Sequence, residues 1–218
     1  MKKPESGNKP KESLIKRFLK SEEPAFSLAR DAAWIVLVVG LVALLLFLFS
    51  GTWPAVVAVE SESMVPNMNK GDLVFVVAAD RYGELQTWNE SLPTGYGKFN
   101  EYPNLYGNAV YGDVIIYKPN GVDSVHPIIH RAVEWYGNAS DGGYITWGDN
   151  NPYPDQMGGI SGIGQLVPVE KEWVVGKAWF AIPLVGYIPL HIIEFAILII
   201  ILMFAHELYL NSREKKKK

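Results

Sequence analysis

Two serines that lie two residues apart follow the end of a long hydrophobic segment. Ser61 and Ser63 stand ahead of Gly71-Asp72, a turn signal that introduces the apolar run Leu73–Val77. A serine hydroxyl is a weak nucleophile unless a base takes its proton and a third group orients that base. The pair therefore predicts nucleophilic catalysis only if the chain also supplies a base and an orienting acid.

The middle of the chain offers two histidines as bases. Pro127 leaves His126 at a turn or a strand start, whereas His130 lies inside an apolar strand that can hold it in place. His130 is therefore the better base, against the alternative that it is an ordinary histidine on a strand surface. Lys118 is a further alternative, but it sits in the turn sequence Tyr117–Gly121, where its ammonium group would be hydrated.

Two carboxylates are candidates for the orienting acid. Asp149 and Asp155 lie in a loop rich in Gly, Asn and Pro, where an irregular backbone can aim a side chain. The spacing permits either one. The alternative is turn chemistry, which is how we interpret Asp72 and Asp113, each of which follows a glycine just before a strand.

Short runs rich in Val, Ile, Tyr and Trp, bounded by turn residues, predict a mainly β domain. The runs are 55–60, 73–78, 109–117, 128–135, 144–147 and 173–178. We expect a folded antiparallel β-sheet that is partly barrel-like. Residues 81–108, rich in Tyr, Gly, Pro and Asn, are interpreted as an ordered insertion.

Hydrophobic segments flank this domain and predict membrane attachment. The predicted order is a basic arm at 1–31, a first transmembrane helix at 32–52, an extracytoplasmic β domain at 53–177, a second transmembrane helix within 178–208 after an interfacial segment, and a Lys-rich tail at 209–218. The first apolar core is too long for a cleavable signal peptide, so we favour an anchor.

Charge sets the expected orientation. Residues 1–30 hold eight Lys and Arg against four Glu, whereas residues 60–177 hold seven against fifteen Asp and Glu. By the positive-inside rule both termini are cytoplasmic and the acidic domain faces the other side. An acidic folded part argues against a nucleic-acid partner. The chain has no cysteine, which excludes disulfides and a thiol nucleophile.

Taken together, the motifs resemble one family. Their order is Ser61-Glu-Ser63-Met-Val-Pro with Gly71-Asp72, then Gly112-Asp113, then Ile129-His130-Arg131, then Gly148-Asp149-Asn-Asn with Asp155. This order resembles the type I signal peptidases, in their archaeal and endoplasmic-reticulum branch. The bacterial branch has a lysine where this chain has His130. The resemblance covers the middle domain and the first anchor, without the insertion.

The resemblance implies a role for each matched residue. Ser63 would be the nucleophile and His130 the general base. Asp155 would orient His130, and Asp149 would be a second functional carboxylate. The Ser61 hydroxyl and the Ser63 backbone N–H would form the oxyanion hole. No cofactor or metal is implied.

The implied function is a membrane-bound serine endopeptidase that removes signal peptides by cutting after small residues of the Ala-x-Ala kind. Its partners would be signal-peptide-bearing preproteins, the lipid membrane and possible translocation machinery. We expect the cell membrane with two spans, and the endoplasmic-reticulum membrane as the alternative. Competing interpretations are a membrane-anchored serine protease for other surface precursors and a catalytically silent binding module.

Overall fold

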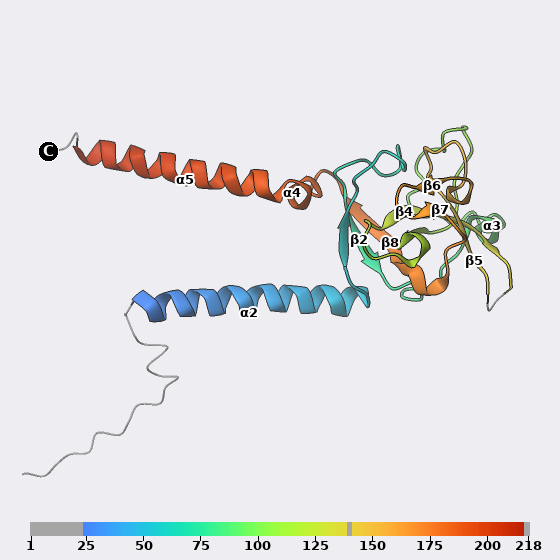
Figure 1. Ribbon diagram of the computed structural model, residues 1–218, viewed down its shortest axis with the longest axis horizontal. Helices are drawn as coiled ribbons and strands as arrows, with labels where there is room; N and C mark the ends of the chain where they lie inside the picture. The colour runs from blue at the N-terminus through green and yellow to red at the C-terminus, as the bar shows by residue number, and fades with distance from the viewer. Residues whose placement is uncertain (1–23, 139–140, 216–218) are drawn as a thin grey trace, which may run out of the picture. The chain divides into compact units, whose positions relative to one another are not determined.

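The computed structural model describes residues 24–138 and 141–215 (Figure 1). Most of the predicted arm 1–31 and the last residues of the predicted tail 209–218 lie outside them. The chain divides into two compact units, with the boundary between Leu48 and Phe49.

The first apolar segment forms one long helix. Helix α2 runs from Pro24 to Ser50, and its stretch Phe26–Ser50 is the only helix among the described residues that is long and apolar enough to cross a membrane. The helix begins ahead of the predicted start at residue 32. No part of the most hydrophobic stretch of this helix is buried by the rest of the described chain. A long, exposed apolar helix of this kind fits a membrane anchor.

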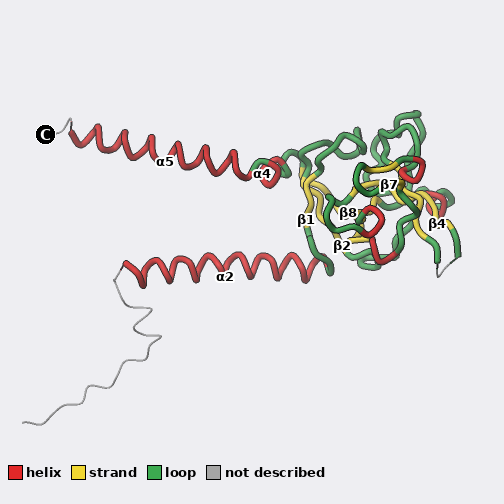
Figure 2. Tube along the Cα trace, in the orientation of Figure 1, coloured by secondary structure: helices red, strands yellow, loops and turns green. Residues whose placement is uncertain are grey.

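The middle of the chain forms an antiparallel sheet of six strands, in the order β1-β2-β8-β3-β4-β5. Figure 2 shows that loops and turns make up much of the chain between these strands. The strands are β1 (Val56–Ala58), β2 (Leu73–Val77), β3 (Val114–Tyr117), β4 (Ile128–Tyr136), β5 (Gly143–Trp147) and β8 (Val174–Ile182). Each lies on one of the predicted runs. A separate hairpin, β6 (Gly159–Ile160) with β7 (Gly164–Gln165), was not predicted.

The sheet is open rather than barrel-like, which corrects the predicted shape. Within the described residues, β1 pairs only with β2 and β5 pairs only with β4, so the two edge strands do not close on each other. The last strand in sequence, β8, instead inserts between β2 and β3. The residues of a strand do not indicate which distant strand it pairs with, so this strand order cannot be predicted from local sequence patterns.

Strand β3 is the buried centre of the domain. Val114 and Ile116 belong to one apolar cluster, and Ile115 and Tyr117 to another, so alternate residues pack on opposite faces of the sheet. All four are at most 1% exposed. Each such side chain contributes about 1.5–3 kcal/mol through burial. The neighbouring strand β4 is therefore held on a rigid support, with His130 directly opposite Ile115.

The insertion 81–108 is ordered by polar anchors. It contains one short helix, α3 (Trp88–Ser91), which begins with a capping box between Thr87 and Glu90. The buried carboxylate of Asp113 accepts hydrogen bonds from the Gln86 N–H and the Tyr96 hydroxyl. Burial, together with the bond to Asp113, raises the pKa of Tyr96. Asp113 thus ties the insertion to the sheet, a larger role than the turn chemistry we expected.

The C-terminal segment differs from the predicted membrane helix at its start. Residues 178–182 belong to β8, and two helices follow, α4 (Tyr187–Leu190) and α5 (Ile192–Lys215). The apolar part of α5, Ile192–His206, is shorter than a standard span, at about 22 Å against roughly 30 Å of hydrocarbon. A second span remains a prediction.

Candidate active site

The loop that carries the two serines is anchored by methionines. Met64 and Met68 are 1% and 0% exposed and lie in the core cluster beneath the loop. One helical turn joins them, because the Met68 N–H donates to the Met64 carbonyl at 2.9 Å. Ser63, directly before the first buried methionine, is held half-buried at the surface of the core.

Ser63, His130 and Asp155 form a continuous hydrogen-bonded relay. The Ser63 Oγ lies 2.9 Å from His130 Nε2, and His130 Nδ1 lies 2.6 Å from Asp155 Oδ2. An ionised carboxylate only accepts hydrogen bonds, so Nδ1 carries the proton and donates to Asp155. Nε2 is then free to accept the Ser63 proton. This is the arrangement that activates a serine as a nucleophile.

Three hydrogen-bond donors converge on Asp155. Besides His130, the Tyr117 hydroxyl and the Thr146 Oγ1 donate to Oδ2, at 2.8 and 2.6 Å. Three donors to one buried oxygen hold the carboxylate in place against His130. Burial and the nearby charge of Asp155 raise the pKa of Tyr117, which therefore stays a donor.

Asp149 contacts an arginine instead of the histidine. Arg131 Nε donates to Asp149 Oδ1 at 2.9 Å and Nη2 donates to Oδ2 at 2.7 Å, a bidentate pair in which both side chains are at most 1% exposed. Asn67, from the serine loop, also donates to Oδ2 at 2.9 Å. Of the two predicted acids, the fold therefore brings Asp155 to His130 and Asp149 to Arg131.

Arg131 is a structural hub that the sequence analysis did not single out. Its remaining donors reach the backbone carbonyls of Lys98, Phe99, Tyr111 and Gly112. A single buried side chain thus joins β4, the loop that carries the acids and the insertion. The available signal was its position: Arg131 follows His130 on a strand, so it must point to the opposite face of the sheet.

Gly148 lies where the serine loop and the histidine meet. A Cβ at this position would be 2.7 Å from the Ser63 carbonyl oxygen and 2.9 Å from His130 Nε2. Only glycine permits so close an approach. The Asn150 N–H donates to the same Ser63 carbonyl at 2.8 Å. The Gly148-Asp149-Asn150 segment thus holds the nucleophile against its base, a role that sequence reasoning did not assign to the glycine.

Ser61 lies beside the nucleophile. Its Oγ is 3.1 Å from the Ser63 Oγ, and because the Ser63 proton points to His130, the Ser61 hydroxyl is the donor of this pair. This contact is made to the attacking oxygen and not to the position of a substrate carbonyl oxygen, so the predicted oxyanion role of Ser61 stays a prediction. Lys118 lies elsewhere, in a 2.6 Å ion pair with Asp123 on the surface.

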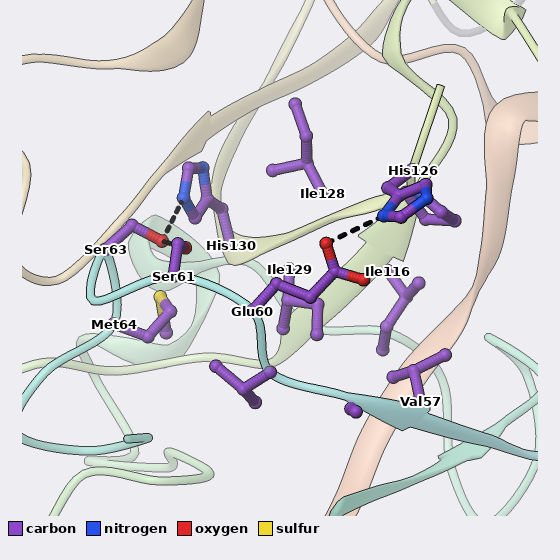
Figure 3. A pocket seen from close by; sticks show the side chains of 13 residues that line it. Val57, Glu60, Ser61, Ser63, Met64, Ile116, His126, Ile128, Ile129 and His130 are labelled. Carbon is purple, nitrogen blue, oxygen red and sulfur yellow. Dashed lines mark hydrogen bonds and ion pairs between the residues drawn. The ribbon is translucent and has the colours of Figure 1, made fainter. Parts of the chain in front are cut away.

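An apolar cleft of about 490 Å³ opens beside the relay (Figure 3). Val57, Ile116 and Ile129 line its floor, and Ser61, Ser63 and His130 stand at one end. An exposed contact of 2.7 Å between Glu60 and His126 crosses its other end. His126, the less favoured base, therefore lies in the same cleft, 2.7 Å from a carboxylate.

No family model matches the chain. A Schizosaccharomyces pombe protein named signal peptidase complex catalytic subunit sec11 is 30% identical over 145 residues, 66% of this chain and 69% of the relative. Proteins of the same name from Neurospora crassa and Leptosphaeria maculans are 29% and 31% identical, each over 64% of both chains.

The chain thus spans about 64% of the length of the Neurospora crassa and Leptosphaeria maculans relatives. The N-terminal apolar helix fits the membrane anchor expected from the resemblance. The similarity to the fungal proteins agrees with the family that the ordered motifs indicated, and the chain belongs to the signal peptidases of the Sec11 type.

Proposed function

We propose that the chain is a membrane-bound serine endopeptidase that removes signal peptides from exported preproteins. The observation that carries this proposal is the Ser63–His130–Asp155 relay, with contacts of 2.9 and 2.6 Å, at the end of an apolar cleft. The family supports a signal peptidase. The serine mechanism rests on the relay.

The proposed mechanism uses this chain's own groups. Ser63 Oγ attacks the scissile carbonyl while His130 Nε2 takes its proton, and Asp155 stabilises the imidazolium that forms. The Ser63 N–H and the Ser61 hydroxyl donate to the oxyanion. His130 then protonates the leaving amine, and in the second half of the reaction it activates the water that hydrolyses the acyl-enzyme.

The cleft supports the proposed preference for small residues before the cut. Its floor is formed by branched aliphatic side chains close to Ser63, which leaves shallow apolar space. Signal peptides end in small residues of the Ala-x-Ala kind. The edge of Ile128–His130 that faces away from β3 has no partner strand among the described residues, so an extended substrate has backbone groups to pair with.

We place the enzyme at a membrane with α2 as its anchor, acting on signal-peptide-bearing preproteins. The relatives are named as subunits of a signal peptidase complex, so we propose that this chain can also work with partner proteins. Cell-membrane location, two spans and contact with translocation machinery remain predictions.

The test is a cleavage assay on the full chain in liposomes. Wild type and Ser63→Ala are incubated with a model preprotein, and mass spectrometry reads the new N-terminus. We expect a cut after a small-x-small site by the wild type alone. A cut elsewhere favours a protease for other surface precursors. Absence of any cut by folded protein, alone and in membranes containing partner proteins, favours the binding module.

A further inference from the structure

A second cavity, of about 320 Å³, lies beside the relay. It shares Ile128 and His130 with the apolar cleft, but it contains Asp155 where the cleft contains the two serines. The two cavities therefore meet along the same short stretch of β4. Figure 3 shows these shared side chains from the cleft.

Three separate segments build the walls of the second cavity. Pro152, Tyr153 and Pro154 come from the loop that leads to Asp155, and Ile160 comes from the β6–β7 hairpin. The chain that follows the hairpin supplies Leu166, which is 7% exposed and whose N–H donates to the Gly158 carbonyl at 3.1 Å.

The hairpin is fixed from outside by Asn120. The Asn120 amide donates to the Gln165 carbonyl at 2.9 Å and accepts from the Val167 N–H at 3.1 Å. The segment that carries Ile160 and Leu166 is therefore tied to a turn that is far from it in the sequence.

We propose that this cavity binds the apolar side chain of one of the first two residues after the scissile bond. The inference rests on the proposed function. His130 must protonate the leaving amine, so that nitrogen lies at His130 Nε2 when the bond breaks. The acyl part lies in the cleft with the serines, and the chain that continues from the amine passes His130 into the second cavity.

The chemistry of the walls selects an apolar side chain over a basic one. Asp155 is the only acidic residue in the wall, and its Oδ2 already accepts hydrogen bonds from His130, Tyr117 and Thr146. That oxygen therefore has little capacity left to accept from a substrate cation. Aliphatic, proline and tyrosine side chains form much of the remaining wall, so a charged side chain would lose its hydration there without compensation.

Gly158 provides a way to fill the cavity without strain. Its backbone is extended, with φ −116°, which any residue adopts. A Cβ there would meet the Asp155 carbonyl oxygen at 3.5 Å and the Tyr153 ring at 4.0 Å, both ordinary contacts. Gly158→Val therefore adds bulk at the cavity wall, and Gly158→Ala is a smaller version that demands no rearrangement. Met157→Val is the matched control, because Met157 is 72% exposed and lies outside the wall.

The experiment compares substrates that are identical up to the cut and carry Leu, Ala or Lys at the first or second position after it. We expect the wild type to prefer Leu over Ala by roughly tenfold in kcat/KM at one position, and to disfavour Lys there. In Gly158→Val this Leu-to-Ala ratio should fall to about one, in Gly158→Ala it should fall partly, and in Met157→Val it should match the wild type.

Two results would overturn the proposal. Equal kcat/KM for all substrates in the wild type would show that the cavity does not bind substrate. A Leu-to-Ala ratio that survives in both folded Gly158 variants would place the preference elsewhere. Failure of the wild type to cut any substrate, alone or in membranes containing partner proteins, is a separate outcome that would remove the proposed function and this inference together.

Discussion

Replacing Gly148 by alanine tests whether the contact between nucleophile and base depends on this glycine. The added Cβ would lie 2.7 Å from the Ser63 carbonyl oxygen, 2.8 Å from Asn151 Nδ2 and 2.9 Å from His130 Nε2. Ordinary contacts to carbon begin near 3.4–3.5 Å, so at least one partner must move by about 0.5 Å or more. The added methyl group would therefore push Ser63 and His130 away from each other.

The expected effect is larger on activity than on stability. Adding about 0.5–0.7 Å to the present 2.9 Å between Ser63 Oγ and His130 Nε2 takes the pair to the limit of hydrogen bonding. A misplacement of about 1 Å at a catalytic centre costs roughly 10²-fold in rate, so we expect kcat to fall about 10- to 100-fold. Overpacking by one methyl group should lower the free energy of unfolding by about 1–3 kcal/mol.

The assay measures kcat/KM for a preprotein and, independently, the rate at which a fluorophosphonate probe labels Ser63. Thermal unfolding in detergent separates loss of fold from loss of geometry. Gly40→Ala is the control, because a Cβ there meets no atom within 4 Å. A Gly148→Ala enzyme with kcat/KM, labelling rate and melting temperature within error of the wild type would refute the argument.

The remaining predictions concern the base, the two acids and alkaline stability. Lys118→Ala should leave kcat/KM within about twofold of the wild type and the free energy of unfolding within about 1 kcal/mol, because the ion pair of Lys118 is exposed. His130→Ala should abolish cleavage. The reverse result in kcat/KM would identify a Ser/Lys enzyme. Asp155→Asn should lower kcat by about 10³- to 10⁴-fold with a modest loss of stability. Asp149→Asn should instead lower the melting temperature first, because loss of one partner of a buried ion pair costs about 3–5 kcal/mol. Equal effects of the two changes on kcat and on the melting temperature would contradict a catalytic role for Asp155 and a structural role for Asp149. The pKa of Tyr117 is raised in the folded state, so its contribution to stability is complete below its unfolded pKa of about 10 and is lost as the pH rises towards its folded pKa. The melting temperature should therefore fall above about pH 10, and it should fall less steeply in Tyr117→Phe. Equal slopes of melting temperature against pH in the two proteins would contradict the raised pKa of Tyr117.

The insertion gains a structural explanation from the same contacts. Arg131 holds the carbonyls of Lys98 and Phe99, and the Leu105 N–H donates to the Asp149 carbonyl at 2.8 Å. The excursion that the resemblance left unmatched thus braces the loop that carries both acids.

Local patterns in the sequence predicted the serine pair, the better candidate base and the strands, and the resemblance implied that Ser63 is the nucleophile of the pair. Ser63 stands at a break between an apolar segment and a strand, and His130 lies inside a strand while His126 precedes a proline. These are properties of a few adjacent residues, so hydrophobic periodicity and turn residues are enough to predict where the serine pair and His130 lie relative to the strands. The six predicted runs became the six strands for the same reason.

Only the tertiary structure decided which acid reaches His130 and in which order the strands pair in the sheet. Asp149 and Asp155 share one loop, and the choice between them depends on Arg131, which is buried on the opposite face of β4 and takes Asp149. The insertion of β8 between β2 and β3, which joins the two halves of the sheet, is likewise a contact between distant segments. Close approach at Gly148 depends on three segments meeting in space, and such contacts leave no pattern in the residues on either side of any one of them.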